Sequence, residues 1–577
     1  MKNSKKILAL LLAVIMLVSC FAGCGKTEAD PVEGEPVAGE NNEATDPKKE
    51  EVADDDLYVI DILVTGTSID SSLDTVIGQY IAEEFGIAFN YIGYSGDIQE
   101  KQALMLAGGD YNEIQYMQYQ TIVQQYMDAG VLINLDDYKD ILPDFYKRFE
   151  NEIPYWRIGS PDGGLYKWEG YAPRDYITKT DHLDMVVRSD VLEYYGYPEL
   201  VSASDWIAFL EQAVKDFPTT PDGQATVGIT APLSESWGMQ GIVPIGYEKG
   251  ETYVACGNDY YTYNVKTEQF EDYLLNPEAK ESFQFFNELY NKGILDEECF
   301  TDTSDVTQQK MNSGRAIAVW YVDWGMNAAN KALTEAGHPE MSYIELPFQL
   351  DSQIGQQYSL PATYVYPFMS YGLTDKCTEP EKVLKFINWC CTEEGQLILQ
   401  SGFEGVHYTV EDGVRVPTDL RKECSLNSEV ALREGISDGT ASTHFKGLPV
   451  VFCAAPDGQP YNLSLESAYK DEFNLSDRQK EVFAAMGWET SNDWWEKNVS
   501  VANAGFSQAC ALDTTSDLGK IGAKMVELRV KYSANLLMAE DFDAVWEELM
   551  AEYDKLDHEA VIDAMNETLE KHKASIG

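Results

Sequence analysis

The stretch from residue 57 to residue 92 constrains the fold more than any other part of the chain. Residues 57–64 form a nearly continuous run of β-branched and aliphatic side chains, which is typical of a buried strand. Apolar residues then recur at helical spacing over 73–81, and a second apolar run follows at 87–92. Strand, helix and strand in this order predict a βαβ unit, and therefore a parallel sheet covered by helices.

The same alternation continues along the chain and then starts again. We expect a helix over 97–106, a strand over 113–116 and a helix that ends before Gly130. From Asp181 the rhythm restarts, and the further elements that we expect are strands over 185–187, 316–320 and 366–373, and helices over 191–195, 204–214 (capped at Ser204), 279–290, 383–390, 393–400 and from Asp541 onwards. A restart of this kind predicts a second α/β lobe.

The N-terminus is typical of an export signal. Three lysines precede an apolar run at 7–17, and Cys20 and Cys24 follow among small residues. The run is shorter than the about 20 apolar residues of a membrane-spanning helix. With a cysteine at the cut, the leader resembles that of bacterial lipoproteins, in which this cysteine is acylated. We favour Cys24, which Gly25 and a polar tail follow, while Cys20 has the better match before the cut and stays the alternative.

Charge and composition exclude several classes of function. Residues 25–56 are rich in Glu, Asp, Pro, Ala and Gly, and we expect them to form a disordered acidic tether. The formal net charge of -55 argues against nucleic acid as a partner, because its binders carry Lys and Arg patches. The same charge argues against docking on anionic lipid through side chains. So many carboxylates indicate a well-solvated surface.

Cysteine and histidine spacing gives no metal or redox motif. The cysteines beyond the leader are scattered without a Cys-x-x-Cys pair, so we expect buried free thiols, with one or two disulfides as the alternative. The six histidines show no His-x3-His or His-Glu-x-x-His spacing, which predicts no metal site, and we expect no cofactor. The sequence contains no Gly-x-Ser-x-Gly elbow and no phosphate-binding loop. Among 97 acidic residues, no pair stands out as the two carboxylates of a glycosidase.

Five stretches give the chain a resemblance to the extracellular solute-binding proteins of ABC importers. The resemblance is to the carbohydrate-type family 1, which includes maltose-binding and alginate-oligosaccharide-binding proteins. The most specific stretch is 393–408, whose Glu-Glu-Gly-Gln-Leu start and Gly-Val-His-Tyr end are very close to a phrase of that family. The other four stretches are 126–138, 187–206, 313–320 and 541–546. Their shared order carries the resemblance over nearly the whole folded chain.

The resemblance implies a periplasmic-binding-protein-like fold of type II, with two α/β lobes and a ligand cleft between them. Ligand contact with both lobes would then stabilise a closed form by its differential affinity. The division that we expect is a signal peptide over 1–24, a tether over 25–56, lobe 1 over 57–180 and 350–415, and lobe 2 over 181–349 and 416–577 with a helix-rich C-terminus.

The resemblance also implies a function and a location. We expect a lipid-anchored receptor on the extracellular face of the cytoplasmic membrane of a Gram-positive bacterium. It would capture a carbohydrate, expected to be an oligosaccharide, and deliver it to the transmembrane subunits of an ABC permease. The implied partners are that ligand, the permease and, through the N-terminal lipid, the membrane. We expect a monomer that is not an enzyme.

One departure from the family bears on metal binding. The alginate-type relatives carry a calcium loop rich in Asp and Asn after the helix that contains Trp206. A calcium cage needs several oxygen side chains at alternating positions. The equivalent stretch here, 216–224, has too few of them, so we predict no calcium at this place.

Candidate ligand residues follow from the chemistry of sugars and from the expected sheets. Sugar sites combine aromatic rings with polar hydrogen-bonding side chains, and ligands of open α/β lobes lie beyond the carboxyl ends of strands. The pair Trp324 and Asp323 is the first choice. The other candidates are Trp320, Trp237, Trp168, Asp110, Tyr111, Tyr119 and Glu404. For Glu404 and its neighbour His407, a role in stabilising the loop is an equal alternative.

Two other classes of function remain as alternatives. The chain would be a surface enzyme that processes glycans, or a glycan adhesin that binds polymer without lobe closure. A peptide or another small solute is the alternative ligand. The strongly acidic composition favours a neutral ligand.

Overall fold

The computed structural model describes thirteen segments of the chain, all within one compact unit, Val52–Gly577. These segments are 57–64, 69–94, 98–170, 184–235, 237–254, 261–320, 325–361, 369–436, 447–451, 454–463, 475–502, 510–513 and 515–576. The leader, both candidate lipid-bearing cysteines and the tether lie outside the described residues. Among the helices that are described, none is long and apolar enough to cross a membrane.

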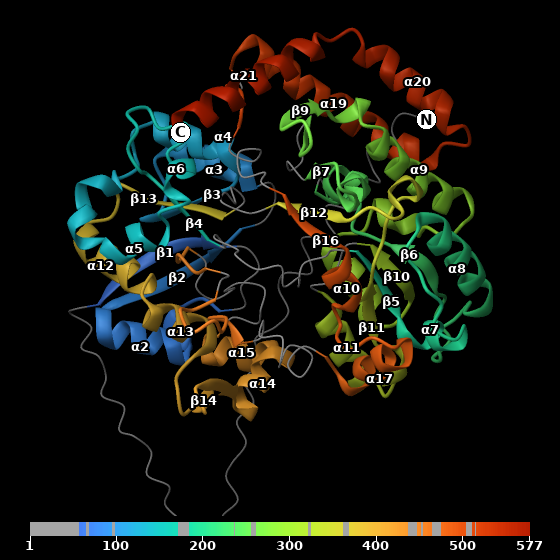
Figure 1. Cartoon of the computed structure of the whole chain (residues 1–577), viewed down its shortest axis with the longest axis horizontal. Coiled ribbons are helices and arrows are strands. Elements are labelled where there is room, and N and C mark those ends of the chain that lie inside the picture. The colour runs from blue at the N-terminus through green and yellow to red at the C-terminus, as the bar shows by residue number, and fades with distance from the viewer. Residues whose placement is uncertain are drawn as a thin grey trace, which may run out of the picture. The chain divides into compact units, whose positions relative to one another are not determined.

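The first sheet has five strands in the order β2-β1-β3-β13-β4 (Figure 1). Its strands are β1 (Tyr58–Val64), β2 (Ile87–Gly93), β3 (Ile114–Met117), β4 (Trp168–Glu169) and β13 (Ser370–Leu373). β1 is parallel to both β2 and β3, which confirms the predicted βαβ unit. β13 is antiparallel to β3 and β4, so the sheet is mixed rather than parallel. β13 belongs to a later part of the chain, and no crossover helix from β3 fixes its direction.

Helices from two distant parts of the chain cover the first sheet. They are α2 (Val76–Phe85), α3 (Ile98–Gly108), α4 (Tyr119–Asp128), α5 (Pro143–Arg148), α6 (Ile153–Trp156), α12 (Pro380–Cys390) and α13 (Glu393–Ser401). Ile60 and Ile62 of β1 pack in one buried cluster with Phe386 and Ile387 of α12. Burying such side chains contributes about 1.5–3 kcal/mol each.

The helices α14 (Asp419–Leu426) and α15 (Ser428–Glu434) belong to the same core. Cys424, Val430 and Ala431 lie in the buried cluster around the first sheet, as does Tyr461. The lobe boundaries drawn from the sequence stay predictions. This packing favours placing the described residues of 416–436, 447–451 and 454–463 with the first lobe rather than the second.

The second sheet has four strands in the order β11-β5-β10-β6. They are β5 (Met185–Arg188), β6 (Val227–Thr230), β10 (Ala316–Trp320) and β11 (Tyr343–Leu346). β10 is parallel to β6, whereas β5 runs antiparallel to both β10 and β11. The restart of the α/β pattern therefore corresponds to a second sheet with its own core.

Both faces of the second sheet are buried. Met185 and Val187 point into the cluster that contains α8 (Ala203–Asp216) and α9 (Pro277–Asn291), while Val186 joins the cluster of α10 (Ser304–Asn312) and α11 (Met326–Glu335). Alternate residues of a strand point to opposite faces, so a continuous apolar run is what a sheet covered on both sides requires. The remaining helix of this region is α7 (Ser189–Tyr194).

The start of α8 differs from the sequence prediction. Ser202, not Ser204, caps the helix: its Oγ accepts a hydrogen bond of 3.0 Å from the backbone N–H of Asp205. The Asp205 carboxylate accepts one of 3.3 Å from the backbone N–H of Ser202. This is a reciprocal capping box, and Ser204 lies within the first turn.

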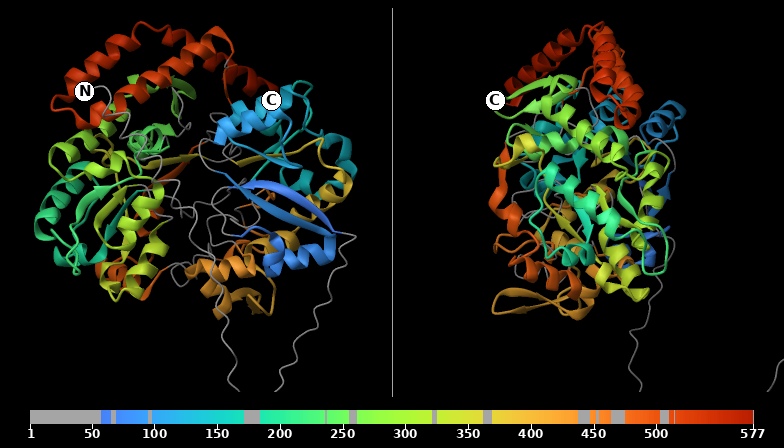
Figure 2. Two further views of the ribbon diagram at one scale, coloured as in Figure 1. Left: turned by 180° about the vertical axis from the view of Figure 1, so that it is seen from behind. Right: turned by 90° about the vertical axis from the view of Figure 1, so that its right-hand side faces the viewer.

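A three-stranded sheet and three C-terminal helices form a further part of the described chain (Figure 2). The sheet contains β7 (Tyr253–Val254), β8 (Tyr261–Asn264) and β9 (Gln269–Asp272), and the helices are α19 (Asp517–Met538), α20 (Phe542–Tyr553) and α21 (His558–Ile576). The Asn566 side chain of α21 donates to the Phe270 carbonyl at 2.9 Å and accepts from the Phe270 N–H at 2.8 Å. α21 thus pairs with the backbone of β9.

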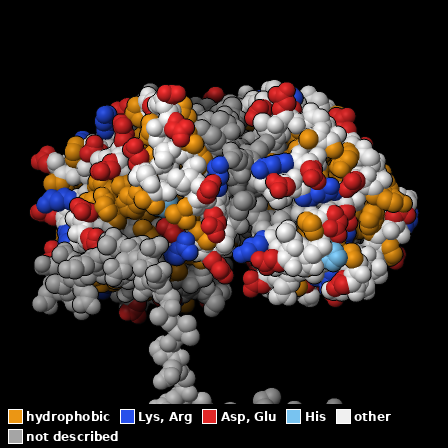
Figure 3. Space-filling model, turned by 90° about the horizontal axis from the view of Figure 1, so that it is seen from below, with side chains coloured by type: hydrophobic (Ala, Val, Ile, Leu, Met, Phe, Trp, Pro, Cys, Tyr) orange, Lys and Arg blue, Asp and Glu red, His pale blue; other side chains and the backbone are white. Residues whose placement is uncertain are grey.

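Short elements lie between these regions. They are β12 (Tyr358–Pro361), which pairs in parallel with β16 (Val499–Ala502), the hairpin of β14 (Tyr408–Glu411) and β15 (Val414–Pro417), and the helices α17 (Asp477–Met486) and α18 (Asp493–Asn498). Figure 3 shows acidic and basic side chains interspersed over the face that it presents, as expected of a solvated surface. Six described cysteines, Cys299, Cys377, Cys390, Cys391, Cys424 and Cys510, are buried free thiols.

Candidate functional site at the carboxyl edges of two sheets

The carboxyl edge of the first sheet holds a buried polar cluster. β3 ends at Met117, which pairs with Ser370 of β13, and Ser370 pairs in turn with Glu169 of β4. The Lys167 ammonium donates to the Glu169 carboxylate at 2.6 Å and lies 3.4 Å from the Gln120 amide oxygen and 3.5 Å from the Ser370 hydroxyl. The side chains of Lys167 and Glu169 are 1% and 0% exposed. Charges buried so deeply persist only when they are paired.

A second carboxyl group near this pair has no partner for one of its oxygens. Glu152, which precedes α6, is 1% exposed, and its Oε2 has no hydrogen-bond partner among the described residues. Burial raises the pKa of Glu152 to about 7, and the charge of Glu169 adds to the effect. The cluster therefore combines one ammonium with two carboxyl groups, one of which changes its charge near neutral pH.

Tyr119 follows β3 at the same edge and has a strained backbone. Its φ of 68° lies in the left-handed region, which a bulky residue other than glycine rarely adopts. The preceding N–H, that of Gln118, donates to the Gln102 amide oxygen at 3.1 Å. Strain of this kind costs on the order of 1–3 kcal/mol and concentrates at binding sites. The strained backbone therefore supports the predicted role of Tyr119 in ligand binding.

The carboxyl edge of the second sheet holds another buried charge pair. Met185 pairs with Trp320, the last residue of β10, so Asp184 lies at this edge. The Asp184 carboxylate forms an ion pair with the Lys249 ammonium, 2.7 Å from Oδ1, and its Oδ2 accepts from the Trp495 indole at 2.9 Å and the Tyr358 hydroxyl at 3.1 Å. Burial raises the pKa of Asp184, although Lys249 and the other donors oppose it. One carboxylate thus connects three segments of the chain that are distant in sequence.

Trp320 is a core residue in the structure, contrary to its predicted role. It is 0% exposed and packs against Phe348, Phe286 and Phe285, with ring centroids at 4.8, 5.7 and 6.2 Å. The residue is the last of a strand, and its side chain points to the α9 face of the sheet rather than beyond the edge. Aromatic residues at strand ends fill cores as readily as they line ligand sites.

Trp168 is also buried. It is 0% exposed, and its indole N–H donates to the Gly447 carbonyl at 2.8 Å. Its ring belongs to the core around the first sheet. The structure therefore gives Trp168 a packing role, and the neighbouring Lys167 and Glu169 supply the polar groups of this edge.

Asp110 and Tyr111 lie at the opposite end of β3 from the predicted position. They precede the strand, so they are at its amino end and not at its carboxyl end. Asp110 is exposed. The Tyr111 hydroxyl donates to Asp375 at 2.9 Å, close to where β13 ends. Tyr119 and the pair Asp110–Tyr111 therefore do not form one site.

The two candidate residues of the family-like loop 402–408, Glu404 and His407, differ in exposure. Glu404 is exposed, whereas His407 is 0% exposed. The His407 Nδ1 accepts from the Phe403 N–H at 2.9 Å, and its Nε2 lies 3.3 Å from the Glu434 carboxylate. Burial lowers the pKa of His407, which favours this neutral, accepting form. Of the two alternatives, His407 stabilises the loop; the role of Glu404 stays a prediction.

Three predicted ligand residues are not placed in full. Trp324 and Asp323 lie outside the described residues. Trp237 begins the short helix η3 (Trp237–Ile242), which comes a few residues after β6, but only its backbone is described. Their roles in ligand binding stay predictions.

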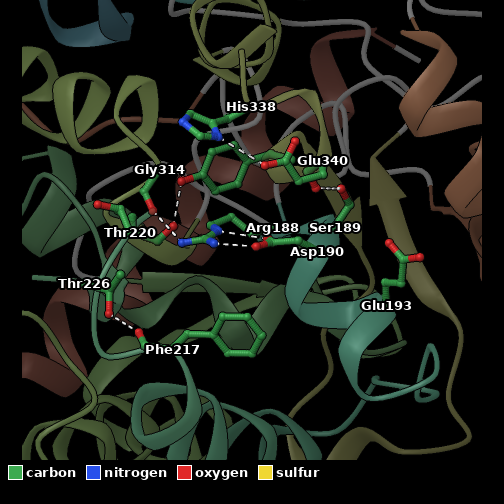
Figure 4. Close-up of polar contacts among 12 residues, drawn as sticks. Arg188, Ser189, Asp190, Glu193, Phe217, Thr220, Thr226, Gly314, His338 and Glu340 are labelled. Atoms are coloured by element: carbon green, nitrogen blue, oxygen red, sulfur yellow. Dashed lines mark hydrogen bonds and ion pairs between the residues drawn. The ribbon is translucent and has the colours of Figure 1, made fainter. Parts of the chain in front are cut away.

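The family-like stretch 187–192 has a structural role (Figure 4). The Arg188 guanidinium donates to both oxygens of Asp190, at 3.0 and 2.5 Å, and to the Gly314 carbonyl at 2.7 Å. The Ser189 hydroxyl donates to the Glu340 carbonyl at 2.8 Å. A buried arginine with fork geometry fixes the turn after β5 against two later segments.

The sequence interpretation missed the charged residues of both edges. Lys167 and Glu169 flank Trp168 at i and i+2, the spacing that places two strand residues on the same face. That spacing is the local signal from which a pair of Lys167 and Glu169 on one face of the strand could have been predicted. No comparable local signal pointed to Asp184 and Lys249, because 65 residues separate them in the sequence.

Known proteins with similar sequences identify the class to which this chain belongs. The chain belongs to the family of bacterial extracellular solute-binding proteins, whose pattern matches residues 77–405. The predicted resemblance is thereby confirmed. Among curated proteins, the lipoprotein LipO of Bacillus subtilis (strain 168) is 24% identical over 294 residues, which make up 50% of this chain and 54% of LipO. The chain thus spans about half the length of this relative.

Solved structures show the same fold over nearly the whole chain. The alginate-binding protein AlgQ2 matches with a TM-score of 0.62 and 15% identity, covering 90% of this chain and 99% of that protein. The substrate-binding protein FusA of the S. pneumoniae ABC transporter matches with a TM-score of 0.60 and 14% identity, covering 90% and 100%. The two-lobed fold of solute-binding proteins is therefore confirmed. At this identity the likeness establishes the fold alone.

Proposed function

We propose that this protein is a lipid-anchored receptor that captures a carbohydrate, expected to be an oligosaccharide, and delivers it to an ABC permease. The observation that carries the proposal is the strained backbone of Tyr119 at the carboxyl edge of the first sheet, beside a buried polar cluster. Backbone strain clusters at functional sites, and ligands of open α/β lobes bind beyond the carboxyl ends of strands, so both observations support a ligand site at this edge.

The named ligands of structural neighbours support a sugar as the ligand. FusA has been solved in complex with kestose and with fructo-nystose, and the S. pneumoniae protein NgtS in complex with Man5GlcNAc. A protein from Bifidobacterium longum infantis is described as HMO-binding. These proteins share the fold with this chain at 13–15% identity. The specific sugar is not carried over.

The family and the leader support an extracellular, lipid-anchored location. The family is extracellular, and the curated relative is a lipoprotein. We propose acylation at Cys24, with Cys20 as the alternative, and attachment to the extracellular face of the cytoplasmic membrane. Two or more acyl chains make a stable anchor. Replacing the acylated cysteine by serine should release folded protein into the medium.

A matched pair of tyrosines tests the proposal. Wild-type protein is screened by thermal shift against oligosaccharides, peptides and amino acids, since a ligand that binds only the folded state raises Tm. With a hit, Tyr119→Ala should weaken binding by about tenfold or more, whereas Tyr111→Ala at the other end of β3 should leave it within about twofold. Isothermal titration calorimetry measures both.

Other results of the same screen would point elsewhere. Stabilisation only by peptides or amino acids would rule out a carbohydrate ligand. Turnover of a glycan would favour the enzyme, and binding of polymer with unchanged small-angle scattering would favour the adhesin. Equal losses in Tyr119→Ala and Tyr111→Ala would remove the assignment of the site to the carboxyl edge.

A further inference from the structure

Lys310 lies at the centre of three carboxylates in the second lobe. Its ammonium is 2.6 Å from Asp296 Oδ2, 2.5 Å from Asp302 Oδ2 and 3.0 Å from Glu298 Oε2. The side chains of Lys310, Asp296 and Asp302 are 3, 4 and 7% exposed, while that of Glu298 is 66% exposed. Two buried negative charges therefore share one buried positive charge.

The carboxylates come from one tight turn. Asp296 caps the helix η6 (Glu297–Phe300): its Oδ1 accepts from the Glu298 N–H at 3.1 Å, and its Oδ2 accepts from Lys310. Burial lowers the pKa of Lys310, but hydrogen bonds to Asp296, Asp302 and Glu298 outweigh it, and the pKa lies above its usual value. The ammonium is therefore charged at any physiological pH.

This turn holds the segment that follows β6. The Leu233 N–H donates to the Cys299 carbonyl at 3.1 Å, and the Ser234 hydroxyl donates to the Asp302 carbonyl at 2.6 Å. The Ser304 N–H donates to Glu235 Oε1 at 2.6 Å. Residues 233–235 lead directly towards Trp237, one of the candidate ligand residues. The position of that backbone thus depends on the turn that Lys310 holds.

The ammonium occupies the place that a bound cation would take. Oxygen ligands surround calcium at about 2.3–2.6 Å. The distances from Lys310 Nζ to Asp296 and Asp302 lie in this range, and that to Glu298 is longer. Among the described residues, no group of three or more His, Cys, Asp or Glu side chains is arranged to hold a metal ion. In this cluster the centre belongs to a covalently attached positive charge instead.

We propose that Lys310 is a positioning residue that acts as a built-in cation, ordering the 296–302 turn and the segment before Trp237 without a metal ion. The proposal bears on the proposed function only through Trp237. Its test uses no sugar, so its failure and that of the proposed function are distinguishable.

The test compares Lys310→Ala with a matched surface variant, Lys292→Ala. Lys292 also contacts two carboxylates, Glu211 at 2.9 Å and Glu288 at 3.8 Å, but its side chain is 36% exposed. Tm is measured in EDTA and in calcium at about 5 mM. This concentration exceeds the largest dissociation constants typical of calcium sites in proteins. Wild type and Lys292→Ala should give the same Tm in both conditions.

Lys310→Ala should lose roughly 5–10 °C in EDTA, because two buried carboxylates are left unpaired. Once the ammonium is gone, the carboxylates that it now holds apart should draw together around calcium, which should restore most of that loss, and calorimetry should find one bound calcium per molecule. Lys310→Ala with Asp302→Asn, which removes one buried carboxylate, should lose the response to calcium. If Lys310→Ala unfolds in EDTA, recovery of its far-UV circular dichroism on adding calcium gives the same answer. A Lys310→Ala protein that is insensitive to calcium, folded or not, would overturn the proposal.

Discussion

The carboxyl edges of the two sheets each bury one lysine, yet they satisfy it differently. At the second edge, Lys249 faces an Asp184 carboxylate that also accepts from Trp495 and Tyr358. At the first edge, Lys167 pairs with Glu169, while the nearby Glu152 keeps an oxygen without a partner among the described residues. A buried carboxylate that faces an ammonium and two further donors is held firmly, whereas a buried acid without a nearby cation of its own is less stabilised. The second edge therefore holds its buried carboxylate in a stabilising network. The first edge, beside the strained Tyr119, contains a buried acid that lowers the stability of the fold.

The largest effect should come from removing the charge at the second edge. Asp184→Asn keeps the shape and leaves the Lys249 ammonium buried without its carboxylate, which should cost about 3–5 kcal/mol of unfolding free energy. Urea unfolding monitored by circular dichroism measures it. The control is Asp543→Asn, since Asp543 pairs with Lys280 at 3.0 Å but is 70% exposed. It should cost about 1 kcal/mol or less. Equal costs for both variants would end the contrast.

The next largest effect on stability comes from Glu152 at the first edge, and it depends on pH. The pKa of Glu152 is raised by burial from 4.5 to about 7, so the folded state binds a proton that the unfolded state has lost. The stability from this group is complete below about pH 4.5 and is lost as pH rises through about 7. Glu152→Gln lacks this loss. It should exceed wild type by about 2–3 kcal/mol at pH 8 and match it near pH 4.5.

Urea unfolding at several pH values checks this difference. The control is Glu150→Gln. Glu150 is an exposed neighbour whose charge makes the smallest of the contributions that raise the pKa of Glu152, so the stability of this variant should follow the wild-type pH profile closely. A Glu152→Gln profile parallel to that of wild type would mean that Glu152 is ionised in the folded protein across this range, and that the two edges are electrostatically alike.

The smallest effects compare one hydroxyl at each edge. The Tyr358 hydroxyl bonds with the Asp184 carboxylate and with both backbone groups of Phe348, whereas the Ser370 hydroxyl lies 3.5 Å from both Lys167 and Glu169. Tyr358→Phe should therefore cost about 1–2 kcal/mol and Ser370→Ala about 0.5 kcal/mol or less. Thermal unfolding gives the order, and the reverse order would contradict the assignment of the tighter network to the second edge.

The sequence allowed the fold to be predicted well, because helical and strand periodicities are local. The βαβ unit at 57–92 and the strand at 316–320 are confirmed, since each reflects burial of neighbouring residues. The sequence did not show that β5 and β13 run antiparallel to their partners. Strand direction depends on pairings between distant segments, on which periodicity is silent.

The site was predictable only in part. Tyr119 follows β3 and lies at its carboxyl end, where we expected it, whereas Asp110 and Tyr111 precede the same strand and lie at its amino end. Trp320 lies at a strand end and still points into the core. The Asp184–Lys249 pair joins residues that only the folded chain brings together, so no motif could show it.

The pairing of α21 with β9 has a consequence for handling the protein. An uncovered edge strand attracts other strands, and proteins cap such edges to stay monomeric. Here the Asn566 amide occupies both backbone groups of Phe270, as a neighbouring strand would. Trimming the chain before Asn566, by protease or by truncation of the gene, would bare this edge and promote pairing between copies of the chain.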